Sequence, residues 1–248
     1  TAMRLLTYDD DGQVSLTKDL LNEDAIPPYA ILSHTWGDEE VTFRDIANGT
    51  GKGKRGNEKL RFCMQQAARD GLRHSWVDTC CIDKSNSQEL QEAINSMFRW
   101  YQKAEKCYVY LADVQHSVLN AEGESALRRS RWFTRGWTLQ ELLAPKWVGF
   151  FSAGGVNLGT KESLKHIIYE ITNIPVEALS GNDLSNFSVD DRFSWAQKRV
   201  TTREEDRSYC LLGIFGVHLP LIYGEGDRSA LYRLREVVDS KLHSGCGK

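Results

Sequence analysis

The fold is indicated by a short apolar run and the polar loop after it: Tyr29-Ala30-Ile31-Leu32-Ser33, then His34 to Glu40. An apolar run of this length is typical of a strand buried on both faces, as in a parallel sheet. The loop carries a histidine, a tryptophan and three acidic residues. We therefore place this strand at the start of the core sheet and treat its loop as a candidate site.

Helices and strands are predicted to alternate downstream of this strand. Apolar residues recur at helical spacing from Asn57 to Asp70, and Asn86 with Glu89 three positions later is typical of a helix start. A further helix, Thr134 to Leu143, ends before Pro145. The β-prone runs between the helices are Ser75 to Asp78, Cys107 to Leu111 and Trp147 to Phe151. This alternation predicts an α/β fold with parallel strand pairing and helices on both faces of the sheet.

The two ends of the chain have different patterns. Arg4 to Leu16 predicts a hairpin, because Asp11-Gly12 separates two β-prone runs. The last hundred residues are predicted to be helical, over 161–172, 189–200, 206–215 and 228–242. We expect an N-terminal hairpin and linker over residues 1–28, an α/β core over 29–152 and a helical extension of the same domain over 153–248.

Composition excludes several classes of protein. The 248 residues are 41% hydrophobic and 26% charged, as in soluble globular proteins, and the net charge of −3 argues against a nucleic-acid-binding surface. No apolar run approaches the ~18 residues of a membrane span, so we expect a cytoplasmic protein. The six cysteines lack metal-ligand spacing and are interpreted as free thiols. We expect no metal and no bound cofactor.

Three segments resemble the fungal heterokaryon-incompatibility (HET) family. They are Ala30-Ile31-Leu32-Ser33-His34-Thr35-Trp36-Gly37, Trp76-Val77-Asp78-Thr79-Cys80-Cys81-Ile82-Asp83, and Arg131-Trp132-Phe133-Thr134-Arg135-Gly136-Trp137-Thr138-Leu139-Gln140-Glu141-Leu142. The resemblance extends into the tail from Phe193 to Gly226. It departs at Lys84-Ser85, where many members of the family have Gln and a small or acidic residue. The resemblance implies a cell-death signalling domain.

A more distant resemblance concerns Toll/interleukin-receptor (TIR) domains. Trp137-Thr138-Leu139-Gln140-Glu141-Leu142 is similar to the W-C-L-x-E-L segment of plant TIR domains, whose glutamate cleaves NAD⁺. Leu32 to Glu39 is similar to the first TIR strand and its exit loop. The resemblance implies a flavodoxin-like, mostly parallel sheet, with Glu141 as the catalytic residue of an NAD⁺ glycohydrolase.

Ligands of open parallel sheets bind beyond the carboxyl ends of the strands. The residues that we expect to bind a dinucleotide there are Ser33, His34, Trp36, Asp38, Asp78, Asp83, Arg135 and Trp137. Cleavage of the nicotinamide–ribose bond passes through an oxocarbenium-like cation, which a carboxylate such as Glu141 stabilises.

Structural interpretations of the same residues remain open. Glu141 can pair with Arg131 or Arg135 or face water, and Trp137 can belong to the core. Asp78 and Asp83 can cap the backbone that follows each of them. His34 and Trp36 can be ordinary loop and packing residues.

Two functional hypotheses follow. The first is an enzyme that releases nicotinamide and ADP-ribose from NAD⁺ and so triggers cell death. The alternative is a non-catalytic module of an innate-immunity-like receptor that signals by homotypic oligomerisation. For both we expect self-association, and the family resemblance permits C-terminal nucleotide-binding and repeat domains in the full protein.

Overall fold

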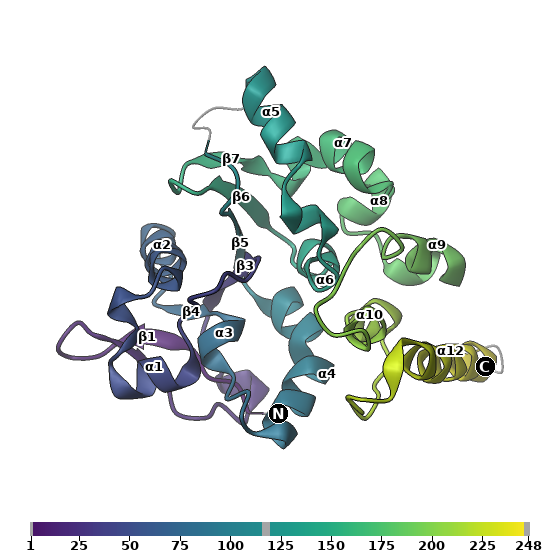
Figure 1. Cartoon of the computed structure of the whole chain (residues 1–248), viewed down its shortest axis with the longest axis horizontal. Helices are drawn as coiled ribbons and strands as arrows, with labels where there is room; N and C mark the ends of the chain where they lie inside the picture. Colours follow the sequence, from purple (N-terminus) through teal and green to yellow (C-terminus); the bar gives the residue numbers. More distant parts are fainter. Residues whose placement is uncertain (1, 116–119, 246–248) are drawn as a thin grey trace.

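The computed structural model describes residues 2–115 and 120–245, which form a mixed seven-stranded sheet flanked by helices (Figure 1). The strands are β1 (Leu6–Tyr8), β2 (Val14–Leu16), β3 (Tyr29–His34), β4 (His74–Trp76), β5 (Lys106–Leu111), β6 (Val148–Ser152) and β7 (Asn157–Thr160). Their order across the sheet is β2-β1-β4-β3-β5-β6-β7. The strand predicted from the first apolar run is therefore the central one.

The four middle strands are parallel. β3 pairs with β4 on one side and with β5 on the other, and β5 pairs with β6. All six residues of β3 are buried, as the apolar run predicts. Ser33 lies opposite Val109 and His34 opposite Tyr110, so β3 and β5 reach the same edge of the sheet together.

The sequence predicts a mostly parallel sheet, and the observed sheet is only partly parallel, because three of the six strand pairings are antiparallel. The Asp11-Gly12 turn forms the β1–β2 hairpin, and Leu6 of β1 then pairs with Ser75 of β4. At the other edge, Gly155 adopts a φ of 73° in the turn after β6, and β7 returns antiparallel to β6. Hairpin connections of this kind extend both edges without crossover helices.

Helices cover both faces of the sheet. Their bounds are α1 (Phe43–Asn48), α2 (Gly56–Arg69), α3 (Asp78–Cys81), α4 (Ser87–Lys103), α5 (Ala121–Arg128), α6 (Thr138–Leu143), α7 (Lys161–Thr172), α8 (Val176–Leu179), α9 (Val189–Ser194), α10 (Asp206–Tyr209), α11 (Leu212–Phe215) and α12 (Gly226–Gly245), with 3-10 turns η1 (Glu23–Ala25), η2 (Gly51–Gly53), η3 (Arg131–Thr134) and η4 (Leu184–Asn186). Helix α2 lies on one face, and α4 and α6 lie on the other (Figure 1). Among the described helices, none is both long and apolar enough to cross a membrane.

The predicted helices were correct where the apolar pattern was long. Asn86 caps α4 by accepting from the backbone N–H groups of Gln88 and Glu89. The helix predicted over Thr134 to Leu143 is instead the 3-10 turn η3 followed by α6, because Arg135 is extended, with a ψ of 140°. The helices predicted over 189–200 and 206–215 are likewise shorter than expected, since α9 ends at Ser194 and the second segment divides into α10 and α11.

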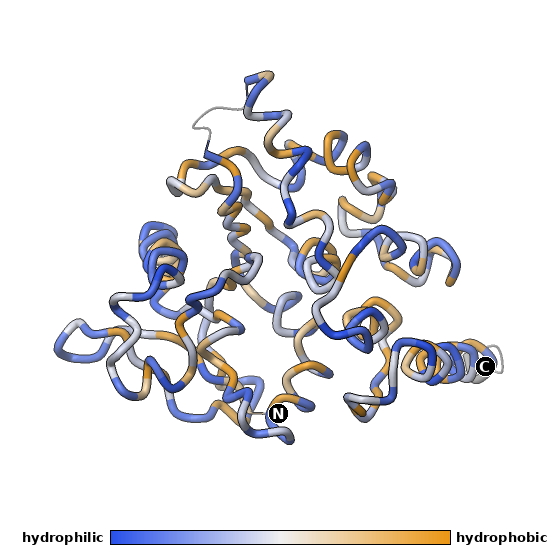
Figure 2. Tube along the Cα trace, in the orientation of Figure 1, coloured by the Kyte–Doolittle hydropathy of each residue, from blue (hydrophilic) through white to orange (hydrophobic). Residues whose placement is uncertain are grey.

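Aromatic side chains fill both faces of the sheet. Phe62 of α2 packs against Tyr108, Tyr110 and Phe151, while Trp132 packs against Phe150 on the other face. Figure 2 shows the apolar residues gathered along the central strands and the helices that cover them, with a hydrophilic turn in the β1–β2 hairpin. Five of the six cysteines are buried free thiols, and Cys246 lies outside the described residues.

Candidate functional site

The last two residues of β3 point to opposite faces of the sheet, because successive side chains of a strand alternate. Ser33 faces α6 and bonds to Glu141, whereas His34 faces α2 and bonds to Lys59. The candidate site therefore has two parts, one on each face, joined by the end of β3.

The first part is a buried hydrogen-bonded chain that ends on Glu141. The Trp132 indole N–H donates to the Ser33 hydroxyl at 2.8 Å, and that hydroxyl donates to a Glu141 carboxyl oxygen. Ser33 is fully buried and Glu141 is 7% exposed. Neither arginine proposed as a partner bonds to it, since Arg131 lies near Asp113 and Arg135 donates to Thr202.

Burial sets the protonation state of Glu141. Loss of solvent raises its pKa to about 8, and the nearby charge of Asp78 acts in the same direction. Hydrogen bonds from Ser33 and Tyr101 and the positive charge of Arg199 oppose this rise in pKa. A carboxyl group with such a pKa titrates near physiological pH, as the acids and bases of active sites commonly do.

The second part is an ion network around His34. The Lys59 ammonium lies 3.0 Å from His34 Nδ1 and donates to the Thr35 carbonyl and to Glu40. An ammonium group can only donate hydrogen bonds, so His34 Nδ1 must accept one and His34 Nε2 must carry the ring proton. His34 Nε2 then donates to Asp78 Oδ1 at 3.1 Å. Lys59 thereby fixes the tautomer of His34.

Trp36 is held at the mouth of this network. Its indole N–H donates to Asp78 Oδ2 at 2.9 Å, and the Lys84 ammonium lies 3.6 Å from the ring centroid. The residue is 52% exposed. Asp78 is partly buried, which acts to raise the pKa of its carboxyl, but Lys84, His34 and Trp36 together lower that pKa. The result is an exposed aromatic ring in a fixed orientation beside a cation.

Four of the predicted site residues lie apart from these contacts. Asp38 is exposed, and Asp83 closes a turn by accepting from the backbone and hydroxyl of Ser85. Arg135 donates to Thr202, and the Trp137 indole donates to Asp206 at 3.1 Å. For Asp83 the structure favours the capping interpretation.

Several residues of the site were missed by sequence reasoning. They are Lys59, Lys84, Tyr101, Trp132 and Arg199. Trp132 stands in the third motif and could have been noticed there. Lys84 directly follows the second motif, at the point where the family resemblance departs. Lys59, Tyr101 and Arg199 come from helices or a loop distant in sequence, with no local signal. Within the described ranges, no group of three or more His, Cys, Asp or Glu side chains could hold a metal ion.

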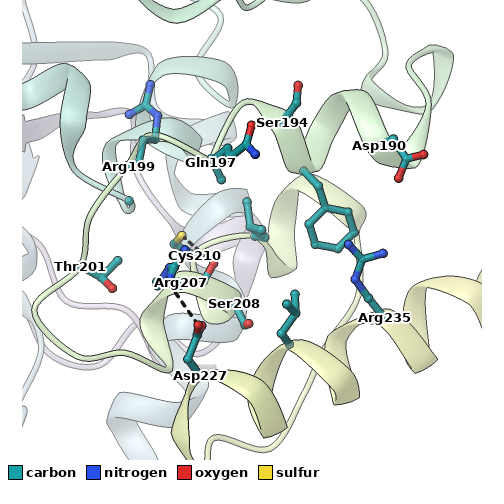
Figure 3. Close-up of a pocket in the computed structure, with 15 residues that line it drawn as sticks. Asp190, Ser194, Gln197, Arg199, Thr201, Arg207, Ser208, Cys210, Asp227 and Arg235 are labelled. Carbon is teal, nitrogen blue, oxygen red and sulfur yellow. Dashed lines mark hydrogen bonds and ion pairs between the residues drawn. The ribbon is translucent and has the colours of Figure 1, made fainter.

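The two described pockets lie away from Glu141. One, of about 310 Å³, is bounded by α9, α10, α12 and the loop that carries Arg199 (Figure 3). The other, of about 220 Å³, lies beside Pro27, Tyr29 and Arg99. Glu141 lines neither of them, and its side chain is buried beneath the end of β3.

Comparison with known proteins agrees with the resemblance to the HET family. Residues 29–126 match the family model described as heterokaryon incompatibility protein (HET). The chain is 58% identical over 242 residues to the vegetative incompatibility protein HET-E-1 of Podospora anserina. That alignment covers 95% of this chain but only 18% of the relative, and no solved structure matches. The chain therefore belongs to the heterokaryon-incompatibility (HET) family and forms its HET domain.

Proposed function

We propose that this HET domain signals cell death in fungal incompatibility by cleaving NAD⁺ to nicotinamide and ADP-ribose, with Glu141 as the catalytic residue. The observation that carries the proposal is the buried Glu141 carboxyl, bonded to Ser33 at the carboxyl end of the central strand β3. Its pKa of about 8 is unusual for a glutamate and is typical of a functional site.

The arrangement of the parallel strands supports a TIR-like, flavodoxin-like relationship. If the four parallel strands are numbered 1 to 4 in chain order, their order across the sheet, β4-β3-β5-β6, becomes 2-1-3-4. A flavodoxin-like sheet begins with the same order. Ligands of such sheets bind where the strand order reverses, which here is between β3 and β5. Glu141 lies on α6, between β5 and β6 in the chain, and reaches back to Ser33 at this point.

The chemistry requires little more than a placed carboxylate and an aromatic wall. Nicotinamide leaves as a neutral ring, so no strong acid is needed, and the positive charge remains on the ribose. Ionised Glu141 would stabilise that charge, and Trp36 offers an exposed ring for a base. Because the ionised form is required, activity should rise as the pH increases through the Glu141 pKa.

Access to Glu141 is the step that self-association would control. The carboxyl group is buried in the single chain and lines neither described pocket. We propose that assembly of several chains opens the site at the end of β3, so that activity depends steeply on protein concentration.

The direct test is incubation of the purified domain with NAD⁺ at low and high protein concentration, with nicotinamide and ADP-ribose separated by chromatography. Glu141→Gln should reduce product at least ~10²-fold, the scale expected for loss of a charge-stabilising group. Glu177→Gln, at an exposed glutamate on α8, is the matched control and should leave the rate unchanged. Absence of nicotinamide from the unaltered domain in every assembly state would remove the catalytic proposal.

A second candidate function has its own support. The Glu141 carboxyl is buried and hydrogen-bonded, as a structural carboxyl would be. On that interpretation the domain is a non-catalytic module that signals by homotypic oligomerisation. Cell death that persists with folded Glu141→Gln protein would favour this alternative.

A further inference from the structure

Arg199 is a buried arginine in the loop that follows α9. It is 5% exposed, and Figure 3 shows its side chain directed away from the middle of the pocket that its loop borders. Nη1 donates to the Arg135 carbonyl and to the Thr138 hydroxyl, both at 2.9 Å, and Nε donates to the Trp195 carbonyl. Two of its bonds therefore fix the start of α6.

One nitrogen of this guanidinium group is left over. Nη2 is buried and has no hydrogen-bond partner among the described residues. A buried cation with an unpaired donor is unfavourable unless a negative charge lies close by. The Glu141 carboxyl becomes such a charge when it ionises, and the two side chains influence each other electrostatically.

The geometry of α6 explains this coupling. Thr138, which bonds to Arg199, and Glu141 are three residues apart, so both lie on one side of the helix. Arg199 Nη2 does not bond to Glu141 in the described residues, where the carboxyl group is instead bonded to Ser33. The spare N–H of Arg199 is thus available when Glu141 ionises.

We propose that Arg199 is a positioning residue for Glu141: it anchors the start of α6 and supplies the positive charge that stabilises the ionised carboxylate. Whether this role of Arg199 contributes to catalysis rests on the proposed function. The role itself, a coupling between two buried side chains from distant parts of the chain, is independent of any substrate.

Other groups that face Glu141 also affect its ionisation. Ser33 of β3 and Tyr101 of α4 favour ionisation through hydrogen bonds, whereas the Asp78 charge from α3 opposes it. The buried thiol of Cys107 on β5 also lies nearby. Arg199 contributes the positive charge among these influences.

Arg235 provides a matched control. It borders the same pocket, but its guanidinium group lies 4.5 Å from the centroid of the Phe193 ring, away from α6. Arg199→Gln and Arg235→Gln remove the same charge from neighbouring places. Arg199→Lys retains the charge and removes the planar fork of donors.

The experiment follows the Glu141 carboxyl carbon by NMR from pH 5 to 10, with the signal assigned by its absence in Glu141→Gln. Arg199→Gln should raise the midpoint by about one pH unit, a tenfold change in the ratio of protonated to ionised carboxyl. Arg199→Lys and Arg235→Gln should stay within about 0.3 unit of the unaltered domain. An unchanged midpoint in folded Arg199→Gln would overturn the proposal.

The remaining outcomes are also decisive. If Arg199→Gln does not fold, Arg199→Met, which also removes the charge, takes its place: a midpoint raised by about a unit would support the role of the charge, and an unchanged one would contradict it. A midpoint that shifts in a domain releasing no nicotinamide refutes the proposed function alone. Nicotinamide release with no shift in the midpoint refutes the role of Arg199 alone.

Discussion

Lys59 connects three acceptors at the end of β3: His34 Nδ1, the Thr35 carbonyl and the Glu40 carboxylate. It is 8% exposed, so its charge is compensated by neighbours rather than by water. This single ammonium group determines which nitrogen of His34 carries the proton and thus how the ring meets Asp78. At the scale of the residue, Lys59 organises the part of the site on the α2 face.

Replacing Lys59 with Met should destabilise the domain by about 2–4 kcal/mol, because Glu40 loses its buried partner and His34 loses a donor. Urea denaturation measures the change in stability. Nitrogen NMR of the His34 imidazole should show that its proton is no longer confined to Nε2. Lys54→Met is the control, since the Lys54–Asp45 pair is more exposed and should be worth at most about 1 kcal/mol. Equal losses in both variants would contradict this account.

Sequence reasoning could identify site residues from their place at the ends of strands, but it could not predict the direction in which each side chain points. Ser33, His34, Trp36 and Asp78 were predicted together, and the structure brings them to the end of β3. Asp83 was grouped with them but turns towards Ser85 instead. Lys59 could not be found, because its place depends on how α2 packs across β3, which no local pattern contains.

Helix α6 is short, and its ends depend on side chains from elsewhere. Arg199 bonds to its start, and the Lys161 ammonium donates to the Leu142 and Pro145 carbonyls near its end at 3.1 and 2.9 Å. An isolated helix of six residues is unstable in water. At the scale of the element, the position of Glu141 is therefore a product of tertiary contacts.

Lys161→Met should cost about 2–3 kcal/mol of stability, since two buried carbonyls at the end of α6 lose their donor. Lys165→Met, on the same helix α7 but bonded to the exposed Glu162, should change stability by less than about 0.5 kcal/mol. Chemical denaturation of both variants provides the comparison. If Lys161→Met leaves the stability unchanged, α6 is held by its other contacts alone.

Element prediction succeeded where periodicity extended over several turns and failed where tertiary contacts decide. The long apolar patterns of α2, α4 and α7 were recognised, and Lys161–Thr172 has the predicted bounds. The division between η3 and α6 was missed, because Val200 forms a bridge with Arg135 and its N–H donates to the Thr134 carbonyl at 2.7 Å. Strand β7 was also missed, since its pairing depends on the turn at Gly155.

The pH dependence of stability is a property of the whole molecule, because each buried ionisable group contributes in its own pH range. The raised pKa of Glu141, about 8 in place of 4.5, means that the folded state retains a proton that the unfolded state releases. This contribution is fully present below pH 4.5, declines as the pH rises towards 8 and is lost above it. The lowered pKa of His74 works in the opposite direction, raising stability as the pH increases through about 6.5.

Glu141→Gln isolates the contribution of the carboxyl group, because His74 and all other groups are common to both proteins. Between pH 5 and 7.5 the unaltered domain should lose up to about 1.4 kcal/mol of stability per pH unit relative to Glu141→Gln. Urea denaturation at half-unit steps would measure the difference between the two curves. Lys161, whose pKa is lowered to about 8, titrates mainly above this window and so does not obscure the slope. Parallel curves across the window would show that the folded domain holds Glu141 ionised, and the assembled site would then need no rise in pH to become active.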